Sequence, residues 1–222
     1  MSSSDLIIFG AGDIAQLAAF YFRRDSTLRP KAFTVDGAYV KEDHFEGLPV
    51  VPFEEVAARY PAAGHQCFIA LSYSALNGVR RSKYEACKAL GYPIASYVSS
   101  RASVLSEEPI GENAFILEDN TIQPFVRIGH NVTLWSGNHI GHHSVIRDHV
   151  FMASQVVVSG GVDIGEQCFI GVNATLRDHI TIGARCVVGA GALLLADAEP
   201  EGVYIGQATE RSRVPSTRLR KL

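Results

Sequence analysis

The sequence has little of several features that would assign it to a class at once. Its formal net charge is only −3 at pH 7, so no basic surface for nucleic acid is indicated. No apolar run is long enough to span a membrane, and no basic segment precedes a hydrophobic one at the start of the chain. We therefore expect no nucleic-acid partner, no membrane insertion and, by default, a cytoplasmic location.

What the chain has instead is a six-residue repeat in its second half. An aliphatic residue or methionine occupies every sixth position, namely Ile110, Ile116, Ile122, Ile128, Leu134, Ile140, Ile146, Met152, Val158, Ile164, Ile170, Leu176, Ile182, Val188 and Leu194. A small residue usually stands two positions earlier, and glycine often follows. A period of six fits neither an α-helix nor a half-buried strand. It is typical of a parallel β-helix, whose coils are stable only when stacked.

Three hexads make one coil of a left-handed β-helix, so residues eighteen apart should stack. We expect about five coils, with the aliphatic side chains inside and glycine at corners that need a positive φ. Cysteine is scarce, with four residues and none at zinc-site spacing. Cys168 and Cys186 should stack inside as free thiols. Asn120 and Asn138 should form a buried, hydrogen-bonded ladder.

The first 98 residues alternate apolar strands with helices instead. Strands are expected at 5–10, 31–35, 47–51, 67–71 and 92–98, with helices at 13–22, 52–60 and 77–90. Such alternation predicts a parallel sheet with helices on both faces. The predicted organisation is an α/β Rossmann-like domain over 1–98, an all-β left-handed parallel β-helix over 99–200, and a basic C-terminal tail over 201–222.

A glycine-rich turn follows the first strand. Residues 10–15 read GAGDIA and open the first helix, and Asp36 ends the second strand. In this context, backbone N–H groups at the helix start bind phosphate, and the carboxylate binds a ribose. The domain is too short for a full dinucleotide site, so a nucleoside diphosphate fits better. A tight turn without a ligand is the alternative. A dinucleotide-dependent oxidoreductase is disfavoured, because no second catalytic domain follows.

Histidines gather in the middle of the repeat. His139, His142, His143 and His149 fall within eleven residues, and none takes an inward position. Three interpretations are open. The histidines are surface residues without a role, or one of them is a general base, or they bind a metal as in trimeric β-helix carbonic anhydrases. The His-x4-His pair of that zinc motif is missing. The pattern therefore favours a general base over a metal site.

Taken together, the two halves resemble the left-handed β-helix (hexapeptide-repeat) sugar acyltransferases of surface-glycan biosynthesis. The most similar groups are the UDP-4-amino-sugar N-acetyltransferases of bacillosamine synthesis, the sialic acid O-acetyltransferases and the GDP-perosamine N-acetyltransferases. This resemblance implies a homotrimer that uses acetyl-CoA, without a metal, to N-acetylate a nucleotide-linked amino sugar. A sugar O-acetyltransferase and a non-catalytic β-helix scaffold remain as alternatives.

The resemblance also implies roles for individual residues. The family's reacting histidine lies in a segment like N-x6-H-[DE]-[CS]-x-I-G-[DE], and residues 135–148 read WSGNHIGHHSVIRD. His142 matches the histidine, and His143 replaces its acidic neighbour. The backbone N–H of Gly160 would bind the thioester oxygen. The coenzyme would lie on Ala153, Gly160, Gly171 and Ala190, and the nucleotide sugar near Gly10, Gly12, Asp36, Asn77 and Arg80.

Overall fold

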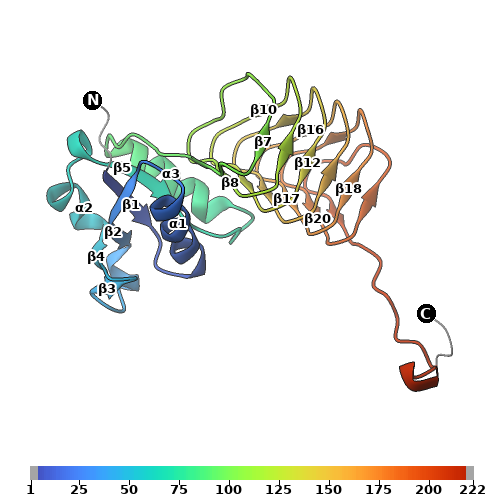
Figure 1. The fold of residues 1–222 in the computed structure, drawn as a ribbon, viewed down its shortest axis with the longest axis horizontal. Helices are drawn as coiled ribbons and strands as arrows, with labels where there is room; N and C mark the ends of the chain where they lie inside the picture. Colours follow the sequence, from blue (N-terminus) through green and yellow to red (C-terminus); the bar gives the residue numbers. More distant parts are fainter. Residues whose placement is uncertain (1–4, 219–222) are drawn as a thin grey trace.

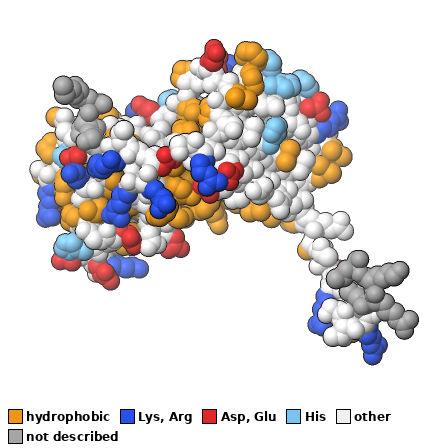
Figure 2. Space-filling model, in the orientation of Figure 1, with side chains coloured by type: hydrophobic (Ala, Val, Ile, Leu, Met, Phe, Trp, Pro, Cys, Tyr) orange, Lys and Arg blue, Asp and Glu red, His pale blue; other side chains and the backbone are white. Residues whose placement is uncertain are grey.

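The computed structural model describes residues 5–218. An α/β domain and a β-helix lie side by side, and the described part of the tail leaves the far end of the β-helix (Figure 1). This part of the tail is exposed and carries basic side chains (Figure 2). Within residues 5–218, no helix has the length and apolar character needed to cross a membrane.

The N-terminal domain is built on a five-stranded sheet in the order β3-β4-β2-β1-β5. Its strands are β1 (Asp5–Phe9), β2 (Arg29–Val35), β3 (His44–Phe45), β4 (Leu48–Pro52) and β5 (Gln66–Ile69). Its helices are α1 (Asp13–Arg24), α2 (Phe53–Arg59) and α3 (Gly78–Ala89), with short turns η1 (Gly37–Tyr39) and η2 (Ala62–Gly64). The first four expected strands and all three helices are confirmed. The antiparallel β3–β4 pair was not expected.

The expected fifth strand at 92–98 divides between the two domains. Ile94 forms a single bridge with Cys67 at the sheet edge, whereas β6 (Tyr97–Val98) pairs with β8 of the β-helix. At the other end, β22 (Val203–Tyr204) pairs with β20. Strand pairing of the β-helix therefore runs a few residues beyond both expected boundaries.

The β-helix has three parallel sheets, which we call its first, second and third faces. The first comprises β6, β8 (Phe115–Ile116), β11 (Thr133–Leu134), β14 (Phe151–Met152), β17 (Phe169–Ile170), β20 (Val187–Val188) and β22. The second comprises β7 (Ser103–Val104), β9 (Thr121–Ile122), β12 (His139–Ile140), β15 (Val157–Val158), β18 (Thr175–Leu176) and β21 (Leu193–Leu194). The third comprises β10 (Arg127–Ile128), β13 (Val145–Ile146), β16 (Asp163–Ile164) and β19 (Thr181–Ile182). Residues eighteen apart pair as far as β21, as the repeat predicts, whereas the last coil is shorter and pairs Val187 with Val203, sixteen residues on.

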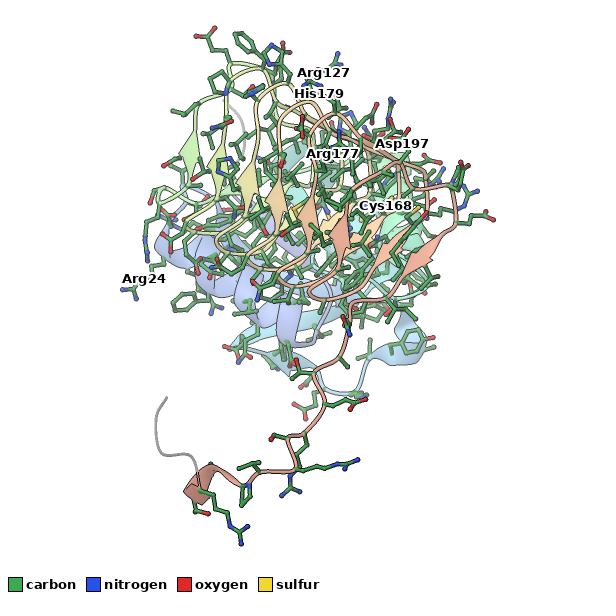
Figure 3. The ribbon with its side chains drawn as sticks, turned by 90° about the vertical axis from the view of Figure 1, so that its right-hand side faces the viewer. Arg24, Arg127, Cys168, Arg177, His179 and Asp197 are labelled. Carbon is green, nitrogen blue, oxygen red and sulfur yellow. The ribbon has the colours of Figure 1, made fainter. Side chains whose placement is uncertain are left out.

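The interior follows the repeat. Residues of the aliphatic series from Ile116 to Val188 are at most 5% exposed. Cys168 and Cys186 precede the paired strands β17 and β20 as buried free thiols, so their predicted stacking is confirmed. Figure 3 places Cys168 within the wall of coils, in contrast to Arg24, which projects into solvent.

The predicted asparagine ladder takes a different form. Asn120 and Asn138 are buried, yet their amide groups do not bond to each other. Both donate to the carbonyl of Trp135, and Asn138 Oδ1 accepts the Val156 N–H at 2.8 Å. A side-chain ladder exists elsewhere: Asn113 donates to Asn131 at 2.8 Å, and Asn131 lies 2.9 Å from His149 Nδ1.

The reason for the repeated glycines also needs correction. The left-handed residue at the corners is the third one after the aliphatic, such as Asn131 and His143, and not the glycine that follows it. A Cβ on Gly141 would lie 2.5 Å from the carbonyl carbon of Ser159 on the next coil. A Cβ on Gly165 would lie 2.5 Å from Ala184 N. Glycine is therefore required because the coils approach closely, not because φ is positive.

Candidate functional site

Two adjacent histidines lie at the corner that follows the second face. His142 and His143 come just after β12, and both side chains are exposed. Their Nδ1 atoms are 3.0 Å apart, with the rings nearly perpendicular. One Nδ1 must therefore carry a hydrogen and donate the hydrogen bond, and the other must accept it. If His142 donates, its Nε2 keeps a free lone pair, which is the state a general base requires.

The position of His143 is fixed by its backbone and by a ring contact. Its φ of 61° places it in the left-handed region, where histidine, asparagine and aspartate are enriched. Its ring centroid lies 4.7 Å from that of Phe125 on the preceding coil. The side chain that meets His142 is therefore held by the corner itself.

Gly160 lies one coil further along, next to His142. A Cβ at this position would be 2.6 Å from Cε1 and 2.8 Å from Nε2 of His142, so the imidazole occupies the space that a side chain would need. Gly161 donates to the carbonyl of His142 at 2.8 Å. Over residues 5–218, the Gly160 N–H has no protein acceptor. A proton acceptor and a free backbone donor are thus adjacent.

Three other expected residues meet in a groove at the corner after the first face. Ala153, Gly171 and Ala190 line this groove, which has a volume of about 360 Å³. Its remaining walls are mainly aromatic: Trp135, Phe151 and Phe169 from the β-helix, with Ile14 and Tyr73 from the N-terminal domain. We call it the aromatic groove. One whole face of the coil separates it from Gly160 and His142.

The N-terminal domain holds a larger cavity of about 670 Å³, which we call the N-terminal cavity. Gly10 and Asp36 line it, and it lies at the carboxyl ends of β1 and β2, where open parallel sheets bind ligands. Lys83 Nζ is 2.5 Å from Asp36 Oδ1 and 5.5 Å from the centre of the Phe9 ring. Gly12 caps α1 nearby, and a Cβ there would have no neighbour within 4 Å.

The structure does not bring Asn77 and Arg80 to the N-terminal cavity. Arg80 is 1% exposed and donates to Thr133 Oγ1 and to the carbonyl of His149. Asn77 donates to the carbonyl of Cys168 at 3.2 Å. Burial lowers the pKa of Arg80 to about 9. These side chains hold α3 against the β-helix, so we remove them from the expected nucleotide site.

Sequence reasoning missed the aromatic wall of the groove. Phe115, Phe151 and Phe169 occupy equivalent outward positions of the first face, at multiples of eighteen residues. Large aromatic side chains that repeat on an outward column indicate a face that another element covers. That signal was present in the sequence. Tyr73 and Lys83 carried no comparable signal.

The fold and its corners define a left-handed β-helix protein with an appended α/β domain. The family model described as bacterial transferase hexapeptide (six repeats) matches residues 161–196. Those residues cover the coils just beyond the histidine pair, and their match agrees with the period seen in the sequence.

Solved structures of similar fold cover almost the whole chain. The acetyltransferase domain of PglB from Neisseria gonorrhoeae FA1090, in complex with acetyl coenzyme A, is 21% identical with a TM-score of 0.81, covering 92% of this chain and 97% of that one. PerB from Caulobacter crescentus, in complex with CoA and GDP-perosamine, is 22% identical with a TM-score of 0.80, covering 91% and 94%. WeeI from Acinetobacter baumannii AYE is 21% identical with a TM-score of 0.78, covering 90% and 96%. This likeness establishes the fold.

Proposed function

We propose that the protein transfers the acetyl group of acetyl-CoA to the amine of a nucleotide-linked sugar for surface-glycan biosynthesis. The observation that carries the proposal is the contact between the His142 ring and Gly160, whose N–H is free. The similar structures with acetyl coenzyme A, and with CoA and GDP-perosamine, support the choice of substrates. We place the reaction in the cytoplasm because acetyl-CoA is the donor.

The chemistry needs one base and one oxyanion donor. The sugar nitrogen attacks the thioester carbonyl carbon, and His142 Nε2 accepts the proton that the nitrogen loses. The Gly160 N–H stabilises the oxyanion of the tetrahedral intermediate, an effect worth about 10²–10³ in rate. The intermediate then breaks its C–S bond, and the departing thiolate takes the proton from His142. The products are an amide and free coenzyme A, with no covalent acyl-enzyme.

His143 acts through His142 in this scheme. By accepting a hydrogen bond at Nδ1, it holds His142 in the tautomer whose Nε2 is unprotonated. A carboxylate there would also stabilise the imidazolium by its charge, whereas a neutral imidazole offers only the hydrogen bond. His143 is therefore a positioning residue.

The N-terminal cavity would hold the nucleoside diphosphate. At the end of β2, Asp36 can accept hydrogen bonds from the ribose hydroxyls. The open amino end of α1 at Gly12 can face the phosphates. The ion pair between Lys83 and Asp36 keeps the carboxylate oriented. Asn77 and Arg80 take no part in this site.

The aromatic groove would hold the coenzyme, and this requires a second copy of the chain. Within one copy, the groove and the pair His142–Gly160 occupy different corners, with the second face between them. A partner that brings its histidine corner against this groove completes the site. We therefore propose a homotrimer with a donor site at each junction.

The surface of the second face suits such an assembly. Its outward residues are Ser103, Thr121, His139, Val157, Thr175 and Leu193, which include no Asp, Glu, Lys or Arg. Val157 is 41% and Leu193 is 62% exposed in the single copy. By contrast, the third face carries Arg127 and Asp163. An uncharged face with exposed aliphatic groups is the better candidate for burial between subunits.

The proposal is tested by thiol release from acetyl-CoA with UDP-, GDP- and dTDP-linked amino sugars, each beside its hydroxyl counterpart. Release with amines alone supports N-acetylation, and release with hydroxyl acceptors alone indicates the O-acetyltransferase. No release with any acceptor favours a non-catalytic scaffold.

A glycine substitution tests the nucleotide site separately. Gly12→Leu should weaken nucleotide-sugar binding and spare acetyl-CoA binding. Gly64→Leu is the matched control, because a Cβ there also meets no atom within 4 Å. Tight NAD binding without nucleotide-sugar binding would end the transferase interpretation of this domain.

A further inference from the structure

The N-terminal cavity and the aromatic groove share a wall made by two loops. In the loop between β5 and α3, Ser74 lines the N-terminal cavity and its neighbour Tyr73 lines the aromatic groove. After β1, Ala11 lines the cavity and Ile14 lines the groove. Residues one to three positions apart thus face two different spaces, so the spaces adjoin each other at these loops.

The loop that carries Tyr73 has an unusual backbone. Ala75, Leu76 and Asn77 have φ values of 50°, 50° and 64°, which makes three consecutive left-handed residues without a glycine. Such a run persists only where its surroundings impose it. Here the Asn77 N–H donates to the carbonyl of Tyr73 at 3.0 Å, and Gln167 Nε2 donates to the carbonyl of Leu76 at 3.4 Å. The β-helix therefore fixes the loop.

Tyr73 is held in place and yet remains available. Its ring centroid lies 4.7 Å from that of Phe169 and 5.1 Å from that of Phe151. It is nevertheless 52% exposed. Over residues 5–218, its hydroxyl has no hydrogen-bond partner in the protein. A tyrosine combines an apolar ring with a polar group that usually finds a partner.

We propose that Tyr73 contacts the sugar ring of the nucleotide sugar and determines which sugar is accepted. The inference rests on the proposed function. With the diphosphate at the amino end of α1, a sugar extending toward the aromatic groove passes Ser74 and reaches Tyr73. The ring of Tyr73 packs against C–H groups of the sugar, and its hydroxyl bonds a sugar substituent. The amine then enters the groove where the acyl donor lies.

The test compares a nucleoside diphosphate with the corresponding nucleotide amino sugar by calorimetric titration. Tyr73→Ala should weaken nucleotide-sugar binding about 10- to 100-fold and change diphosphate binding less than about twofold. Tyr73→Phe keeps the ring contacts, so it should lower the affinity for the nucleotide sugar about three- to tenfold and leave the affinity for the diphosphate unchanged. Tyr39→Ala is the contrast, because Tyr39 lines the N-terminal cavity and is 71% exposed. It should weaken both ligands equally.

Three results overturn the proposal. If Tyr73→Phe loses affinity for both ligands to the same extent, the loop contributes to binding of the nucleotide only. An unchanged sugar affinity with a raised KM for acetyl-CoA would make Tyr73 part of the donor groove. If the wild type binds the nucleoside diphosphate and the nucleotide amino sugar equally well, or binds neither, the sugar contributes nothing to binding and Tyr73 does not contact it. Sugar-dependent binding without thiol release would instead refute acetyl transfer and leave the contact intact.

Discussion

Replacing His142 with asparagine should lower kcat by about 10²–10⁴ and change KM for acetyl-CoA by less than about twofold. At about 1.4 kcal/mol per tenfold change, the loss corresponds to about 3–6 kcal/mol of transition-state stabilisation. Asparagine retains a polar side chain beside Gly160 but cannot take the proton from the sugar amine. KM is spared because the imidazole acts mainly as the bond forms.

The effect of His143 should be smaller. Its link to His142 is one 3.0 Å hydrogen bond between two imidazoles, and a neutral hydrogen bond is worth about 0.5–1.5 kcal/mol. His143→Ala should therefore lower kcat about three- to tenfold. His143→Asp should recover or exceed wild-type kcat, because aspartate tolerates a left-handed φ and adds a charge that stabilises the imidazolium.

A backbone control separates the hydrogen bond from strain at the corner. Asn173 is exposed and has a φ of 57° at a different corner, so thermal melting of Asn173→Ala reports the cost of alanine in this conformation. Thiol release at saturating substrates gives kcat for each variant, and thermal melting reports the fold. Near-full activity in His142→Asn, with a large loss in His143→Ala, would refute the assignment and make His143 the base. The tautomer of His142, read by ¹⁵N NMR, should shift in His143→Ala even without substrate.

Burial lowers the pKa of His149, so the folded state favours its neutral ring. The contribution of His149 to stability is therefore complete above its unfolded-state pKa of 6.5 and is lost as the pH falls below that value. Lowering the pH from 7.5 to 5 should reduce the melting temperature of the wild type more than that of His149→Gln. Equal losses in the two proteins would contradict this. Arg80→Ala should lower the free energy of unfolding in urea by about 2–4 kcal/mol. Arg80→Met should lower it less, because methionine keeps the buried aliphatic part of the side chain. An alanine variant as stable as the wild type would contradict a role of Arg80 in holding α3 against the β-helix. Leu193→Glu should convert a trimer into a monomer near 24.0 kDa in light scattering, and a wild type of that mass at micromolar concentration would rule the trimer out.

The interior of the β-helix was predictable because one local rule repeats. Each aliphatic position faces inward, and its partner is eighteen residues away for as long as the period lasts, so the register follows from counting. The stacking of Cys168 on Cys186 needed nothing more. The same counting put Gly160 one coil from His142, although it could not show that the imidazole occupies the missing side chain's space.

The junction between the domains could not be predicted from any period. The family resemblance placed Arg80 near the nucleotide sugar, yet its side chain is buried against Thr133 and the carbonyl of His149, more than fifty residues away. Its role depends on how α3 docks on the first face. Nothing local to residue 80 encodes that docking. The fifth strand divided between the domains for the same reason, since the end of the α/β sheet and the first coil compete for residues 92–98.

The corners explain where such a protein can change its chemistry without losing its fold. The second and third residues after each aliphatic lie outside the apolar interior of the coils, and at an exposed corner the third needs only to tolerate a left-handed backbone. Asn131, His143, Gln155 and Arg185 all occupy that third position here. A histidine can therefore stand at position 143, where the motif of the family that the sequence resembles has an acid, at no cost to the packing inside. Under the proposed mechanism the cost falls on catalysis instead, because a neutral His143 would orient the base but add no charge to stabilise it.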